Sequence, residues 1–93
     1  MPLPERARRS FIQAEAAIKE KKFPEAAQLL RNVVTLAPWS PLGWYDRALV
    51  QAEVGEYAQA VVNMHMFLNL APDAPQARGA QDLIYEWERK VKK

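Results

Sequence analysis

The sequence predicts an all-α fold in which five antiparallel helices build a repeated helical hairpin. Prolines and glycines divide the 93 residues into segments of helix length, with almost no sign of the alternating pattern of a strand. A second observation is a self-similarity at an offset of 34 residues, which is typical of stacked helical repeats. The length favours one domain, and 49% apolar with 26% charged residues excludes a disordered chain.

The first two helices are predicted from composition and apolar spacing. Residues 4–21 are rich in Ala, Glu, Lys, Arg and Gln, which are good helix formers. Their apolar side chains follow i, i+3, i+7 spacing at Phe11, Ala14 and Ile18. A second helix is expected from Pro24 to about Ala37, because proline is tolerated in a first helical turn and Pro38 ends the helix.

The remaining three helices are predicted from their start and stop signals. Ser40 is expected to cap a third helix over residues 41–54, which begins with a proline. Gly55 is expected to end that helix in a left-handed conformation. A fourth helix is expected over residues 57–70, and a fifth from Pro75 to the carboxyl terminus, with one apolar side.

The internal repeat aligns residues 7–40 with residues 41–74. Small residues recur in the middle of the helices, an aromatic residue recurs at the turn of each hairpin, and a Leu-Ala-Pro tripeptide recurs at the end of each unit. The pairs are Phe11 with Tyr45, Ala14 with Ala48, Phe23 with Tyr57, Ala26 with Ala60, Leu30 with Met64, and residues 36–38 with 70–72. Matches at structural positions indicate a true repeat.

This unit resembles the tetratricopeptide repeat, whose pattern is W-x2-L-G-x2-Y, then G-x-Y-x2-A, then a closing proline. The second unit carries Trp44, Ala48, Gly55, Tyr57, Ala60 and Pro72 at matching places, and the first carries Ala14, Phe23, Ala26 and Pro38. The resemblance implies a right-handed α-α superhelix with repeats over 7–40 and 41–74 and a capping helix over 75–93.

Two departures from the repeat pattern carry structural expectations. Lys21 stands where the second unit has Gly55, and a positive φ costs a non-glycine residue about 1 kcal/mol or more. The first turn is therefore expected to differ from the second or to be looser. Arg47 is a charged residue at an expected core site, and it is expected either to extend its guanidinium to the edge of the core or to pair with Asp82.

The chemistry of the sequence argues against catalysis and cofactors. It holds one His, no Cys and no Gly-rich phosphate loop, so neither an enzyme nor a metal or cofactor site is expected. Met64 and His65 are neighbours on a helix, where side chains point about 100° apart, so Met64 is expected in the core and His65 outside. A net charge of +2 and basic ends without interleaved aromatics argue against nucleic-acid binding.

The surface expected to carry function is the concave groove that the resemblance implies along the first helix of each hairpin. Its predicted lining is Arg8, Phe11, Glu15, Ile18 and Lys19 from the first unit and Leu42, Tyr45, Leu49, Ala52 and Glu53 from the second. The expected function is a non-enzymatic protein interaction module that binds a peptide or partner helix there. Leu42, Asp46 and Ala80 stand where related chaperone co-factors carry the basic and asparagine residues that clamp a carboxyl-terminal carboxylate. Binding of a chaperone tail in this way is therefore not expected.

The alternative is a self-assembling homodimer or a fragment of a larger scaffold, because two repeats fall below the roughly three that usually make such arrays stable. No apolar run approaches the ~20 residues of a membrane span, so no membrane insertion is expected. The chain is expected to be soluble, in the cytoplasm or, if a signal peptide has been removed, in the periplasm.

Overall fold

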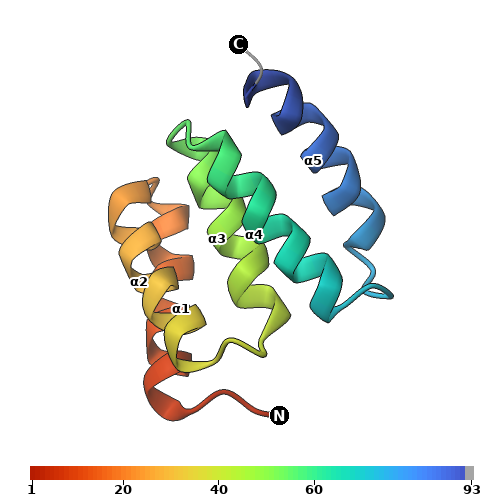
Figure 1. The fold of residues 1–93 in the computed structure, drawn as a ribbon. Coiled ribbons are helices and arrows are strands. Elements are labelled where there is room, and N and C mark those ends of the chain that lie inside the picture. The colour runs from red at the N-terminus through yellow and green to blue at the C-terminus, as the bar shows by residue number, and fades with distance from the viewer. Residues whose placement is uncertain (92–93) are drawn as a thin grey trace.

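The computed structural model describes residues 1–91. It contains the helices α1 (Glu5–Lys19), α2 (Phe23–Leu36), α3 (Pro41–Glu53), α4 (Tyr57–Leu70) and α5 (Ala77–Val91), with no strand among these residues (Figure 1). Each helix packs chiefly on the next along the chain, and the result is an elongated stack of 39 × 29 × 19 Å. The prediction of an all-α fold of helical hairpins is confirmed.

The repeat is visible in the backbone, because equivalent residues of the two hairpins have the same torsion angles. Lys22 and Glu56, which precede the second helix of each hairpin, have φ of −91° and −90°. Ala37 and Ala71, which follow that helix, have φ of −140° and −142°. Both alanines precede a proline, which favours an extended conformation in the residue before it. The two hairpins therefore enter and leave their second helix in the same way.

The turn inside the first hairpin repeats the second turn, so the expectation that it would differ or be looser is wrong. Lys21 has φ of 59° and Gly55 has φ of 83°. The amide of Lys22 donates to the carbonyl of Ala17 at 2.8 Å, and in the second hairpin the amide of Glu56 donates to Gln51 at 2.8 Å. The hydrogen bonds of the helix end hold Lys21 in the left-handed region despite its side chain.

The connection between the two hairpins is held by an indole. Trp44 Nε1 donates a hydrogen bond to the carbonyl oxygen of Pro38 at 2.9 Å. Ser40 precedes α3 as expected, but its side chain makes no capping hydrogen bond. Helix α5 begins at Ala77 instead of Pro75, since Pro75 lies in a turn in which the amide of Ala77 donates to the carbonyl of Ala74, directly after a turn in which Ala74 donates to Ala71.

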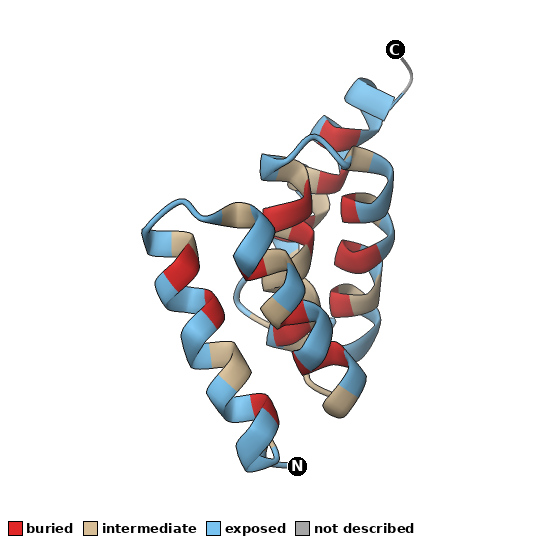
Figure 2. Cartoon of the chain, turned by 90° about the vertical axis from the view of Figure 1, so that its left-hand side faces the viewer, coloured by how far each residue is buried: buried red, intermediate tan, exposed pale blue. Residues whose placement is uncertain are grey.

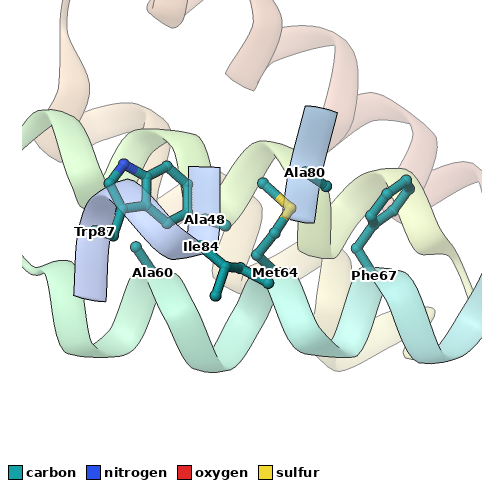
Figure 3. Packing of buried hydrophobic residues seen from close by; sticks show 7 residues of the cluster. All are labelled: Ala48, Ala60, Met64, Phe67, Ala80, Ile84 and Trp87. Carbon is teal, nitrogen blue, oxygen red and sulfur yellow. The ribbon is translucent and has the colours of Figure 1, made fainter. Parts of the chain in front are cut away.

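The core consists of two clusters, and buried residues occur at intervals along every helix (Figure 2). One cluster joins α1, α2 and α3 around Leu30 and Val50. In the other, Ala80, Ile84 and Trp87 of α5 lie over α3 and α4 (Figure 3). The four alanines that recur in the middle of the helices of the two repeats are fully buried: Ala14, Ala26, Ala48 and Ala60.

Three polar side chains of α3 and α4 interrupt the packing between apolar residues. Gln51 and Asn63 are both buried, and the Asn63 amide donates to the Gln51 side-chain oxygen. Arg47 is half-buried and forms no ion pair with Asp82, which is exposed. The predicted pairing of Arg47 with Asp82 is therefore wrong.

Candidate functional site

A cleft of about 610 Å³ runs along the side of the molecule formed by α1, α3 and α5. These are the first helix of each hairpin and the closing helix. Its lining is Glu15, Ile18, Lys21, Phe23, Asp46, Leu49, Val50, Ala52, Glu53, Leu83 and Trp87. The cleft exists because α1 and α3 belong to neighbouring hairpins, whereas contact between the hairpins is made chiefly by α2 and α3.

The apolar part of the lining comes from three helices. Ile18 belongs to α1, Leu49 to α3, and Leu83 and Trp87 to α5. Leu49 and Leu83 are partly buried against the second cluster, so each presents one side to the core and another to the cleft. An open surface of this kind gains free energy when a ligand covers its apolar atoms, at roughly 25 cal/mol per Å².

The charged part of the lining is acidic. Three acidic side chains, Glu15, Asp46 and Glu53, line the cleft together with one basic side chain, Lys21. The chain as a whole has a net charge of +2, so the sign of the cleft is opposite to that of the molecule. Within residues 1–91 the structure has ion pairs between Arg8 and Glu5 and between Lys22 and Glu20, and none at these three carboxylates.

Asp46 is the most unusual of the three acids. Its Oδ2 is buried and has no hydrogen-bond partner among the described residues. Burial raises the pKa of Asp46 to about 8, and the neighbouring Glu15 carboxylate contributes to the shift through a side-chain hydrogen bond and through its charge. An acid in this setting is stabilised either by a proton or by a cation that approaches from the cleft.

The predicted groove residues divide between the cleft and its surroundings. The cleft lining includes Glu15, Ile18, Leu49, Ala52 and Glu53, whereas Arg8, Phe11, Lys19, Leu42 and Tyr45 lie outside it. Arg8 pairs with Glu5 at 3.3 Å, and Phe11 packs on the cluster around Leu30. Tyr45 packs edge-on against Phe67, with ring centroids 4.9 Å apart.

Sequence reasoning missed six residues of the cleft: Lys21, Phe23, Asp46, Val50, Leu83 and Trp87. Leu83 and Trp87 had a visible signal, because they are four residues apart on the apolar side of the last helix. The predicted role of this helix was to cap the repeats, and none of its residues was included in the predicted groove lining. Asp46 was placed at a groove position by the comparison with the carboxylate clamp, but it was left out of the predicted lining, and its burial depends on how neighbouring hairpins pack.

A second cavity of about 330 Å³ lies between α3 and α4 and is lined by Arg47, Gln51, Ala58, Gln59, Val62 and Asn63. Burial and the nearby Arg31 lower the pKa of Arg47. On α4, Met64 is buried and His65 is exposed, as predicted. Within residues 1–91, no three or more His, Asp or Glu side chains form a group that could hold a metal ion.

None of the helices α1 to α5, in the part of the chain that the structure describes, has the length and apolar character needed to cross a membrane.

Comparison with known proteins agrees with the repeat seen in the backbone. The family model for the tetratricopeptide repeat matches residues 13–84, from the middle of α1 into α5. The search of curated proteins gave no match. With most of the chain matched and both hairpins included, the protein belongs to the tetratricopeptide repeat family, whose members are generally non-enzymatic modules that bind other proteins.

Proposed function

We propose that this protein is a non-enzymatic interaction module that binds a peptide or a helix of another protein in the cleft between α1, α3 and α5. In this proposal residues 7–40 and 41–74 are the two repeats and residues 75–93 are the cap, of which 92–93 lie outside the described residues. The observation that carries the proposal is the cleft itself, which combines apolar side chains from three helices with carboxylates at defined positions. The family relationship supports protein binding in general.

The dimensions of the cleft suit a short segment of polypeptide. Its volume of about 610 Å³ falls within the roughly 300–1,000 Å³ that ligand sites usually have. A few apolar anchors in such a site supply most of the binding free energy, and polar groups around them fix the orientation. Ile18, Leu49 and Leu83 are the apolar residues that would contact the anchors.

The test uses a phage-displayed library of random 12-residue peptides, selected on the full chain. Selected peptides are then synthesised and titrated calorimetrically against wild type, Ile18→Gln and Ile12→Gln. Ile12 is the matched control, because it lies on the same helix, is 52% exposed and is absent from the cleft lining. Glutamine keeps the length of the side chain and a good helix propensity in both variants.

The expected result is that Ile18→Gln weakens binding of the selected peptides about tenfold and Ile12→Gln leaves it unchanged. Loss of one well-packed aliphatic contact is worth about 1–2 kcal/mol, which corresponds to this factor. Failure to select any peptide, or equal binding by both variants, would reject the proposed cleft. Circular dichroism checks that both variants retain the helical content of wild type.

Self-assembly, the alternative expected from the small number of repeats, stays a prediction that sedimentation across a range of concentrations can check. Trp87 is not a suitable probe of a dimer interface on α5. It is 6% exposed in a single chain, so Trp87→Ala would open the core. Tyr85, which is 59% exposed on the same helix, is the better residue to substitute.

A further inference from the structure

We propose that the segment recognised by this cleft is basic, and that a lysine or arginine side chain of the partner enters the cleft between Asp46 and Glu15 while neighbouring apolar residues contact Ile18 and Leu49. The inference rests on the proposed function, because it names the chemistry of the partner for the same site. It follows from the arrangement of charges in the cleft together with an unsatisfied oxygen.

The balance of charge in the lining favours a cationic ligand. Glu15, Asp46 and Glu53 outnumber Lys21, and no ion pair of residues 1–91 neutralises any of the three acids. Ionising Asp46 beside Glu15 is unfavourable, because the two negative charges repel one another and partial burial strengthens the repulsion, and Asp46 therefore holds a proton at neutral pH. A partner that supplies a positive charge removes that unfavourable energy, whereas an acidic partner adds to it.

Asp46 marks the place for this charge. It lines the cleft, and its Oδ2 is buried without a hydrogen-bond partner among the described residues. A buried acceptor with no donor costs free energy until a donor reaches it. Ammonium and guanidinium groups are hydrogen-bond donors only. Both carry a positive charge, which would pair with Asp46 and Glu15.

The carboxylates favour an organic cation over a metal ion. Although three of them line one cleft, the described residues include no group of three or more His, Asp or Glu that could hold a metal ion. A long flexible side chain with several donors can contact Glu15 and Asp46 without such convergence. Its aliphatic stem would lie along Ile18 and Leu49, which line the same cleft.

The helix positions set the expected sequence of the partner. Asp46 and Leu49 are three residues apart on α3, and Glu15 and Ile18 are three residues apart on α1. Side chains at this spacing lie on the same face of a helix. Each helix therefore presents an acid next to an aliphatic residue, and the partner should carry its basic residue within about four positions of an apolar one.

The experiment continues from the peptides selected on the full chain. Their affinities are measured calorimetrically for wild type, for Asp46→Asn, for Glu15→Gln and for the double variant. Asp73→Asn is the matched control, since Asp73 is exposed in the turn before α5 and absent from the cleft lining. Each peptide is also made with its basic residues replaced by glutamine.

The expected result has three parts. Selected peptides share a lysine or arginine near an apolar residue, the double variant weakens their binding about 10- to 100-fold, and Asp73→Asn leaves it unchanged. Replacing the basic residue of the peptide weakens binding to wild type by a similar factor, but has little further effect on the double variant, because the two changes remove the same interaction.

A further readout separates direct contact from general attraction. Titrations in buffers of different ionisation enthalpy should show release of a proton from wild type near pH 7, because a cation beside Asp46 displaces its proton. The release should be absent in Asp46→Asn.

Two other outcomes have distinct meanings. Peptides that lack basic residues and whose binding depends on Ile18 but not on Asp46 or Glu15 would overturn this inference and leave the proposed cleft in place. If no peptide depends on Ile18, the proposed function fails, and the inference fails with it.

Discussion

The ring of Tyr45 meets the ring of Phe67 edge-on, with centroids 4.9 Å apart and ring planes at 66°. This contact joins α3 to α4 within the second hairpin, where Phe67 is fully buried. Aromatic pairs in this geometry add about 0.5–1.5 kcal/mol beyond the area they bury. Tyr45, a predicted groove residue, therefore contributes to the packing of the hairpin.

Tyr45→Ala is expected to lower the free energy of unfolding by about 2–3 kcal/mol, because it removes a half-buried ring from contact with Phe67. Urea denaturation followed by circular dichroism measures the change. Tyr45→Phe keeps the ring and is expected to stay close to wild type. Unchanged stability in Tyr45→Ala would contradict the packing role.

Asp46 is expected to make the stability of the protein fall as the pH rises. Its pKa is about 8 in the folded chain, against an ordinary value of 3.8, so between these values the folded state holds a proton that the unfolded state has lost. The stabilisation is complete below about pH 4 and disappears as the pH rises through 8.

Asp46→Asn removes this linkage. Near pH 8 the variant is expected to be more stable than wild type by about 1–3 kcal/mol, a figure that allows for the partial exposure of the carboxyl group. Thermal denaturation of both proteins from pH 4 to 9 measures the difference, and Asp73→Asn controls for the substitution itself. A difference that does not vary with pH would count against the buried acid.

Lys21→Gly is expected to stabilise the protein by about 0.5–1 kcal/mol, since Lys21 occupies the left-handed region with φ of 59° and glycine does so without a steric cost. Lys22→Gly is the matched control. Lys22 has φ of −91°, which suits any residue, so glycine at this adjacent position should reduce stability. Equal effects of the two variants on the melting temperature would argue against the shared turn geometry.

Gly43 and Gly79 are expected to respond to alanine in opposite directions. A Cβ at Gly43 would lie 3.0 Å from Val33 Cγ1 and 3.3 Å from Val34 Cγ1, so Gly43→Ala should cost about 1–2 kcal/mol. A Cβ at Gly79 meets nothing within 4 Å. Gly79→Ala should therefore gain about 0.5–1 kcal/mol from helix propensity. Chemical denaturation of both variants tests the pair.

Much of the fold was readable in the sequence because it depends on local signals. Prolines and small residues fix where helices end and where they pack closely, and the offset of 34 residues shows that the same hairpin occurs twice. The exceptions are also local. Lys21 adopts a left-handed conformation that its side chain disfavours, because the hydrogen bonds of the hairpin turn are stronger than that preference.

The candidate site was harder to predict, because a cleft depends on residues distant in the sequence. Periodicity indicated that Tyr45 and Leu49 share a face of α3, but it did not show that Tyr45 packs on Phe67 while Leu49 lines the cleft. Asp46 follows Tyr45 in the sequence, and the spacing of apolar residues around it did not indicate that it would be partly buried. Its environment is set by burial and by Glu15, which belongs to α1 in the other hairpin.

Helix α5 packs chiefly on α4, yet its Leu83 and Trp87 form part of the wall of the cleft. In a stack where each helix packs mainly on its neighbours, a terminal helix can detach at a lower free-energy cost than an internal one. Detachment of α5 would remove that wall. Any molecule that touches Leu83 or Trp87 would consequently slow amide hydrogen exchange along α5, so the order of the last helix would report whether the cleft is occupied.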